Sequence, residues 1–213
     1  MLPLNTITKE NLNLIDEKFN KYQSAVIFGK GPTFQIIKKE KEEELFICVN
    51  ETLNYIDDCD MLIITDIEKI NVISLERLKD LKWLLVPEFL HFKCRYNPNV
   101  TWKTLLKKIK DYFSGQWIIF NLRTNPKPNK ILITLPSTLT AGNLATNFVC
   151  LHLNKYIKEI KYYGIGIKTD NTKPYASEFT RTTPHPFSDH YIEQIRKQII
   201  NDCDNAKIKY ELF

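Results

Sequence analysis

A glycine-rich turn follows the first apolar run of the chain, where residues 25–28 lead into Gly29, Lys30, Gly31, Pro32 and Thr33. The apolar run predicts a buried strand. Glycines let the backbone adopt positive φ and let a ligand approach closely, and proline has the φ of a first helical turn. We therefore predict a helix from Thr33, whose unpaired amides would face a phosphate. The turn lacks the ending of a P-loop, so a plain strand-to-helix turn is the alternative.

A cluster of small residues forms a second candidate anion site, at the start of the helical pattern over residues 144–157. Its members could offer polar side chains or backbone amides to a phosphate or a ribose: Thr138, Thr140, Gly142 and Asn143. Simple N-capping by Thr140 is the alternative, although it accounts for one residue of the cluster only. The strand predicted over residues 157–163 runs into a further glycine pair, Gly164 and Gly166.

An acidic residue, Asp66, follows the apolar run over residues 61–65, which we predict to be a buried strand. Open α/β sheets place ligand-contacting groups at the carboxyl ends of their strands, so Asp66 is a candidate ligand contact. Aspartate is also a favourable N-cap, and a capping role for the following segment is the alternative.

Residues 168–190 form a loop-like segment before the last predicted helix. A loop of this length inside a domain is typically functional. The segment contains side chains suited to proton transfer and to phosphate: His185, His190 and Arg181. A histidine could deprotonate an acceptor hydroxyl, and an arginine could stabilise a leaving phosphate. For His190, which follows Asp189, capping of the last helix is the alternative.

The order of apolar runs and amphipathic segments predicts an α/β protein. Strands are expected over residues 25–28, 45–49, 61–65, 83–86, 116–122, 157–163 and 206–213. Residues 131–134 are expected to form either a short strand or an approach to the site. Helices are expected over residues 8–22, 75–82, 101–113, 144–157 and 191–201, besides the one from Thr33. We expect residues 1–213 to form one nucleotide-binding domain with a lid at 168–190.

The composition and net charge of the chain indicate which ligands, metal sites and cellular location to expect. The chain has 213 residues, of which 43% are hydrophobic, and a net charge of +5. This mild positive charge favours anionic ligands, and no aromatic signature accompanies the basic clusters, so nucleic acid is not expected as the main partner. Five cysteines without a CxxC pair predict reduced thiols and no structural zinc. No leader peptide or transmembrane run is visible, so we expect a cytoplasmic protein, with the inner membrane surface as a further location.

Taken together, the glycine turn at residues 29–33, the strand ending at Asn50 and the helix start at residues 140–143 resemble the family 42 bacterial sialyltransferases. They also resemble two Rossmann-type relatives, the motility-accessory-factor glycosyltransferases and the archaeal 6-hydroxymethylpterin pyrophosphokinases. The resemblance covers residues 24–66 and 137–167. It implies a three-layer Rossmann-like α/β domain with a mostly parallel central sheet and a short C-terminal lid.

The resemblance also implies a nucleotide site. Residues 29–31 would face phosphates, Asn50 and Asp66 would lie near the nucleoside or sugar, and residues 138–142 would hold the other side of the donor. In the sialyltransferases the donor is a cytidine monophosphate sugar, no metal is needed, and a lid histidine acts as the base. This chain departs from the usual pattern at Lys30 (often Asn), at Thr33 (usually Ser), and at the position after Gly166, where relatives carry Asp.

The expected function is therefore transfer of a sugar, of the sialic-acid type, from a nucleotide-sugar donor to a hydroxyl-bearing glycan or small molecule, without a metal cofactor. One alternative is a pyrophosphokinase that uses Mg²⁺, with Asp66 as the expected metal ligand. Another is a non-catalytic nucleotide-binding or interaction module. The sequence is compatible with an oligomer and does not specify one.

Overall fold

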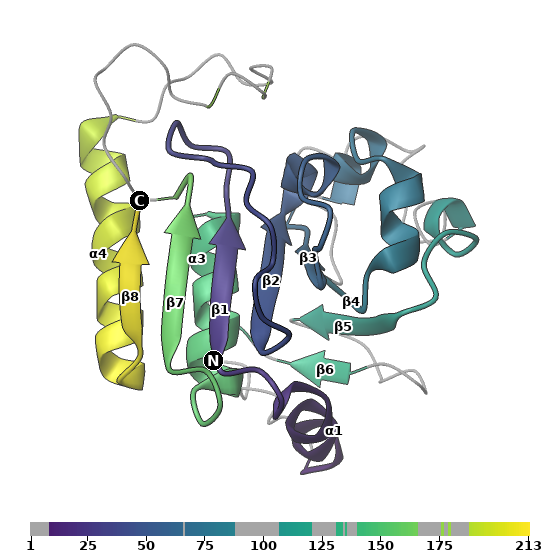
Figure 1. Cartoon of the computed structure of the whole chain (residues 1–213), viewed down its shortest axis with the longest axis horizontal. Coiled ribbons are helices and arrows are strands. Elements are labelled where there is room, and N and C mark those ends of the chain that lie inside the picture. Colours follow the sequence, from purple (N-terminus) through teal and green to yellow (C-terminus); the bar gives the residue numbers. More distant parts are fainter. Residues whose placement is uncertain are drawn as a thin grey trace, which may run out of the picture.

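In the part of the chain that the computed structural model describes, eight parallel strands form the centre of the fold (Figure 1). They are β1 (Ser24–Phe28), β2 (Glu44–Val49), β3 (Met61–Ile63), β4 (Trp83–Pro87), β5 (Gln116–Phe120), β6 (Ile131–Ile133), β7 (Glu159–Tyr163) and β8 (Lys209–Leu212). The structure describes residues 9–65, 67–87, 107–120, 131–133, 135, 140–165, 176, 179 and 188–213. Each neighbouring pair of strands runs parallel, which confirms the expected α/β fold and parallel sheet.

The strand order is β6-β5-β4-β3-β2-β1-β7-β8. The chain therefore adds strands on one side of β1 up to β6, and then returns to add β7 and β8 on the other side. Because the connections leave β1 and β7 in opposite directions, the carboxyl ends of these two strands form the switch point of the sheet. Ligands of open α/β sheets bind at such a point.

The longer helices cover one face of the sheet (Figure 1). They are α1 (Lys9–Phe19), α3 (Ala141–Phe148), the π-helical turn η5 (Val149–Leu153) and α4 (Asp189–Ala206). Successive side chains of a strand point to opposite faces, so Ile27 and Ile47 meet these helices while Val26 and Phe46 do not. The helices carry the apolar residues that complete this half of the core, as expected for amphipathic segments.

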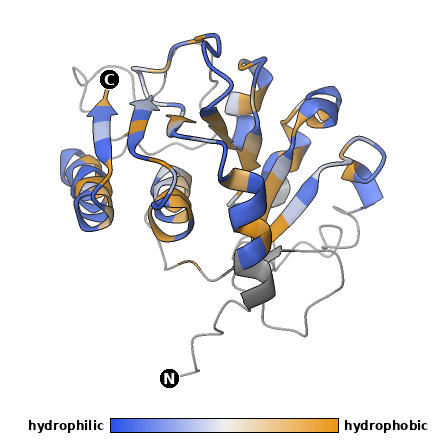
Figure 2. Ribbon diagram, turned by 60° about the horizontal axis from the view of Figure 1, so that its bottom comes forward, coloured by the Kyte–Doolittle hydropathy of each residue, from blue (hydrophilic) through white to orange (hydrophobic). Residues whose placement is uncertain are grey.

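Short 3₁₀ helices cover part of the opposite face. They are η1 (Asn50–Asn54), η2 (Ile67–Asn71) and η3 (Leu75–Asp80). Val26 and Phe46 belong to this second half of the core, together with Leu53 and Leu78 from the 3₁₀ helices. Hydrophobic residues gather where these layers meet the strands (Figure 2). In the part of the chain that the structure describes, no helix combines the length and apolar character needed to cross a membrane.

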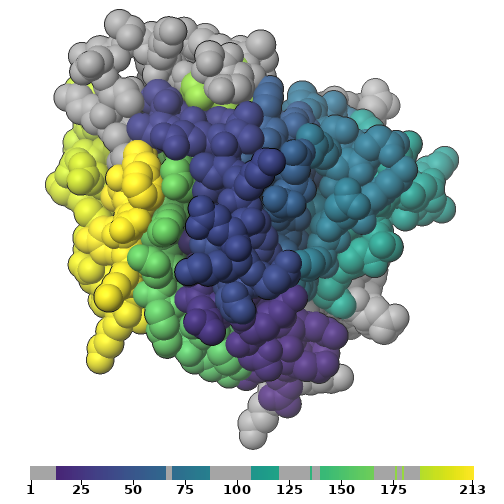
Figure 3. Space-filling view, in the orientation of Figure 1, coloured from purple at the N-terminus to yellow at the C-terminus, as the bar shows by residue number. Residues whose placement is uncertain are grey.

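The helix predicted to begin at Thr33 is absent, so that prediction is wrong. Residues 34–41 connect β1 to β2 without regular secondary structure and lie across the front of these strands (Figure 3). Phe34 is buried, Ile36 is 59% exposed, and seven charged residues follow at positions 38–44. The segment therefore has too little apolar surface to hold a helix against the sheet, because packing of an apolar face supplies most helical stability.

Other predicted elements have different bounds. The helix expected over residues 75–82 is the shorter 3₁₀ helix η3, and the one expected over 191–201 is α4, which begins at Asp189. Residues 107–109 are helical, within the expected range 101–113, whose first six residues lie outside those described. The predicted edge strand near the end of the chain is β8, beside β7.

Candidate functional site

The glycine turn after β1 is bonded to the chain that leaves β7. The Gly29 N–H donates to the Tyr163 carbonyl and the Gly31 N–H donates to the Gly164 carbonyl, both at 2.8 Å. In return, the Gly164 N–H donates to Thr33 Oγ1 at 3.1 Å. Two amides that the sequence directs at a phosphate therefore donate to carbonyls of the protein itself.

These glycines are needed because two stretches of backbone meet. Gly164 has φ of +71°, and a Cβ there would lie 2.3 Å from the Gly29 carbonyl oxygen. A Cβ on Gly31 would lie 2.6 Å from the Gly164 carbonyl oxygen. Gly142 also reaches this junction, since a Cβ on it would lie 3.0 Å from Ile165. The structure thus joins glycines from three separate sequence segments into one junction at the switch point.

An ion pair links the ends of the two neighbouring strands β1 and β2. Lys30 Nζ lies 2.7 Å from Glu51 Oε1, and Lys69 Nζ lies 4.0 Å from the same oxygen. The Glu51 side chain is 10% exposed and the two lysine side chains are 18% and 20% exposed. Lys30 is one of the site residues predicted from the sequence, whereas Glu51 and Lys69 were not predicted.

Two side-chain oxygens near this ion pair are buried and accept no hydrogen bond from any residue that the structure describes. They are Asn50 Oδ1 and Glu51 Oε2, and each of the two residues is only 8% exposed. Asn50 also adopts φ of +53°, in the left-handed region. A buried polar group without a partner costs about 1–3 kcal/mol, so a native protein that retains two adjacent ones requires an explanation. A ligand that donates hydrogen bonds to them would provide one.

The start of α3 has a clear structural role. Thr140 is the N-cap, and its Oγ1 accepts from the Asn143 N–H at 3.2 Å. Asn143 is fully buried and donates through Nδ2 to the Ile195 carbonyl of α4 at 3.0 Å. N-capping by Thr140 is confirmed, and contact of Thr140 or Gly142 with a nucleotide stays a prediction.

His190 lies in the first turn of α4 and is exposed to solvent. Its Nε2 lies 3.0 Å from Gln194 Nε2. The N-cap of α4 is Ser188, whose Oγ accepts from the Tyr191 N–H, so neither His190 nor its neighbour Asp189 caps this helix. Among the described residues, His190 forms no hydrogen bond or ion pair with another predicted site residue. The remaining predicted site residues lie outside the described part of the chain: Asp66, Thr138, Gly166, Arg181 and His185.

Two described residues of the predicted lid pack beside the candidate site. The Ala176 N–H donates to the Lys30 carbonyl at 3.0 Å. Phe179 is 8% exposed, and its ring centroid lies 5.0 Å from those of Phe34 and Tyr55. These contacts hold part of the segment 168–190 against the glycine turn and against the end of η1.

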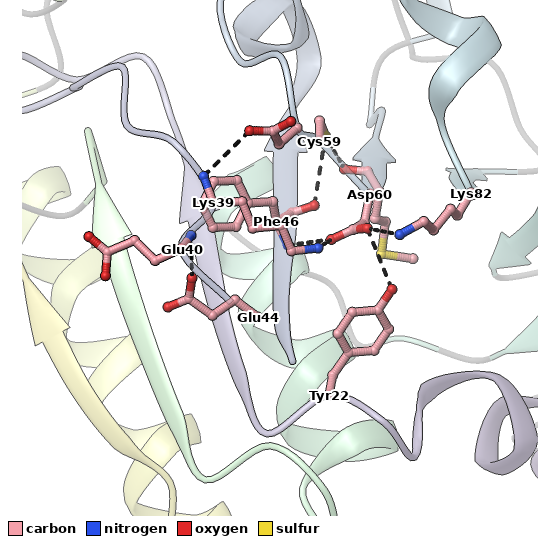
Figure 4. Close-up of polar contacts among 10 residues, drawn as sticks. Tyr22, Lys39, Glu40, Glu44, Phe46, Cys59, Asp60 and Lys82 are labelled. Carbon is pink, nitrogen blue, oxygen red and sulfur yellow. Dashed lines mark hydrogen bonds and ion pairs between the residues drawn. The ribbon is translucent and has the colours of Figure 1, made fainter. Parts of the chain in front are cut away.

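A second buried carboxylate, Asp60, lies at the amino-terminal end of β3 (Figure 4). Its Oδ1 accepts from Lys82 Nζ at 2.6 Å and from the Tyr22 hydroxyl at 3.5 Å. Its Oδ2 accepts from Lys39 Nζ at 2.7 Å and from the Phe46 N–H at 3.0 Å. Both oxygens are satisfied by the protein. This cluster ties the irregular connection between β1 and β2 to the sheet.

No family model matches the sequence, and no curated protein matches it. Among solved structures, the chain is similar to the sialyltransferase CstII from Campylobacter jejuni, in complex with a substrate analogue, cytidine-5′-monophosphate. The identity is 15% and the TM-score is 0.49, over 89% of this chain and 79% of that one. The α/β fold itself follows from the strand order and pairing described above.

Proposed function

We propose that this protein binds a nucleotide at the carboxyl ends of β1 and β2 and acts as a glycosyltransferase. The observation that carries the proposal is the pair of buried, unpartnered oxygens of Asn50 and Glu51. They lie at the carboxyl end of a parallel strand, next to the switch point, which is where open α/β sheets bind nucleotides. The resemblance of the sequence to nucleotide-sugar enzymes supports the choice of reaction.

The proposed reaction needs no metal. The acceptor hydroxyl would lose its proton to the imidazole of His185 or His190 while its oxygen bonds to the anomeric carbon of the donor sugar. The bond between that carbon and the phosphate oxygen would break, and the nucleotide would leave with the electron pair. Arg181 would stabilise the charge on the departing phosphate. A sialic-acid-type sugar on cytidine monophosphate is the first donor to test.

Thermal unfolding with added nucleotides tests the binding half of the proposal. The panel contains CMP, UMP, AMP and GMP, the corresponding diphosphates and triphosphates, and CMP-, UDP- and GDP-sugars, each with Mg²⁺ and with EDTA. A ligand present at one hundred times its Kd adds about 2.7 kcal/mol of stability, which for a chain of this size raises Tm by about 5–10 °C. We expect such a shift with a nucleotide in EDTA. No shift with any compound would contradict the proposal.

Measurement of sugar transfer tests the catalytic half of the proposal. With the donor that gives the largest shift, we expect release of the nucleotide to depend on the histidines. His185→Ala or His190→Ala, whichever removes the base, should abolish transfer and retain the thermal shift. A shift and turnover that require ATP and Mg²⁺ would instead indicate diphosphate transfer. A shift without turnover of any donor would indicate a nucleotide-binding module.

A further inference from the structure

The two unpartnered oxygens restrict what kind of group can lie at the end of β2. A carboxylate oxygen and an amide oxygen only accept hydrogen bonds, so the ligand must donate at this position. A phosphate near neutral pH has few protons to donate to such acceptors. These two oxygens are therefore poor partners for the phosphate of a nucleotide, although they suit hydroxyl or amino groups.

The ion pair orients the carboxylate. Glu51 Oε1 lies 2.7 Å from Nζ of Lys30, a residue of the glycine turn, and this contact anchors the Glu51 side chain. Oε2 belongs to the same planar group and is left as the acceptor without a partner. Asn50, the preceding residue, contributes the second acceptor. Asn50 and Glu51 together offer two unpartnered acceptors at the carboxyl end of β2, which suits a ligand with more than one hydrogen-bond donor.

The position of Glu51 indicates which donors these are. It follows Gly31 by 20 residues and lies at the carboxyl end of the second strand. In dinucleotide-binding α/β folds, an acidic residue about 20 residues after the glycine turn accepts hydrogen bonds from ribose hydroxyls. The glycine turn of this chain differs from that fingerprint, but the strand order places the carboxylate beside the turn in the same way.

We propose that Glu51 Oε2 and Asn50 Oδ1 accept hydrogen bonds from the 2′- and 3′-hydroxyls of a ribose, so that the site selects ribonucleotides over 2′-deoxyribonucleotides. This inference rests on the proposed nucleotide-binding function and names the part of the ligand that these residues bind. Removal of the 2′-hydroxyl would leave one buried acceptor unpartnered in the complex, and sites built around a substrate hydroxyl reject analogues that lack it.

The test compares binding of CMP, UMP, AMP and GMP with binding of their 2′-deoxy counterparts, measured by calorimetry on the full chain. We expect the preferred ribonucleotide to bind at least about tenfold more tightly than its deoxy form. Glu51→Gln should reduce this ratio to within about threefold, mainly by weakening the ribonucleotide. Glu43→Gln, which removes an exposed carboxylate, should leave the ratio unchanged.

The comparison in the wild-type protein requires no variant to fold. Equal binding of the two forms of the preferred nucleotide would overturn the inference and leave the proposed function intact. Affinity that depends on the base and not on the 2′-hydroxyl would also overturn it, since the acceptors would then read an amino group. Absence of binding by every nucleotide would overturn both proposals together.

Discussion

Asp60 and Glu51 are two buried carboxylates at opposite ends of the parallel sheet, and each lies near two lysines. Asp60 receives four hydrogen bonds, two on each oxygen, from Lys39, Lys82, Tyr22 and the Phe46 N–H (Figure 4). Glu51 uses one oxygen for its ion pair and leaves the other without a partner. A carboxylate whose two oxygens both accept hydrogen bonds from the protein has a structural role. A carboxylate with one oxygen that accepts none is suited to bind a ligand.

The largest expected effect is the difference in stability lost when each of these two carboxylates is neutralised. Asp60→Asn would leave two lysines and a buried amide without their charge partner, which costs about 3–5 kcal/mol. Glu51→Gln should lower the free energy of unfolding by less, about 1–2 kcal/mol, because it weakens only the ion pair of Oε1 with Lys30 and its Oε2 has no bond to lose. Urea unfolding of the two variants measures the difference, and Asp58→Asn, on an exposed aspartate nearby, serves as the control. Equal losses at the two positions would contradict the comparison.

The two lysines of the Asp60 cluster provide the next test. The Lys39 side chain is 10% exposed and the Lys82 side chain is 44% exposed, although their distances to Asp60 are nearly equal. We expect Lys39→Met to cost about 1–3 kcal/mol, because it removes a buried charge-assisted bond. Lys82→Met should cost at most about 1 kcal/mol, since water screens that pair. If the two losses are the same in urea unfolding, burial does not control the strength of this cluster.

A substitution at Asn50 should raise the free energy of unfolding, whereas the substitution at Asp60 should lower it. Asn50→Gly would remove the unpartnered oxygen and relieve the positive φ, so we expect a gain of about 0.5–1 kcal/mol in stability and a loss of nucleotide affinity. Lys207→Gly is a matched control, because Lys207 also has positive φ (57°) and lies on the surface. A gain at position 50 that exceeds the gain at 207 measures the cost of the orphan oxygen. A loss of stability at position 50 would mean that Asn50 is structural.

The strands could be predicted from the sequence because each is a short apolar run bounded by polar residues or glycine. The irregular connection after β1 could not be predicted, because Pro32 and Thr33 favour a helix locally. What prevents the helix is the lack of apolar surface in residues 34–44. Tertiary packing overrides local preference there.

The candidate site was predictable in part. The glycines do converge, although Gly29, Gly31 and Gly164 face one another's backbones and the Ile165 side chain. Gly29 and Gly164 are more than one hundred residues apart, so no local pattern reveals this contact. The end of the apolar run points to Asn50 as the site residue and not to Glu51, which follows it. The spacing of 20 residues between Gly31 and Glu51 was the signal that could have identified Glu51. The four partners of Asp60 come from four separate segments, so the sequence contains no local trace of that cluster.

The smallest expected effect concerns the weakest partner of Asp60 and depends on pH. The Tyr22 hydroxyl lies 3.5 Å from Oδ1, at the limit of a hydrogen bond, so Tyr22→Phe should change stability at pH 7 by less than about 0.5 kcal/mol. Burial, and secondarily the charge of Asp60, raises the pKa of Tyr22 above its ordinary value of about 10.

Because the folded state holds this proton more tightly than the unfolded chain, the contribution of Tyr22 to stability is fully present below pH 10. It is lost as the pH rises further, since the unfolded chain then releases the proton first. The phenylalanine variant has no proton to lose. We therefore expect it to become more stable than the wild type by about 1 kcal/mol near pH 11, as measured by urea unfolding at pH 7, 9 and 11. A difference that stays constant with pH would show that Tyr22 lies outside the electrostatic reach of Asp60 and is not held protonated by burial, and the cluster would then consist of the lysines and the Phe46 amide alone.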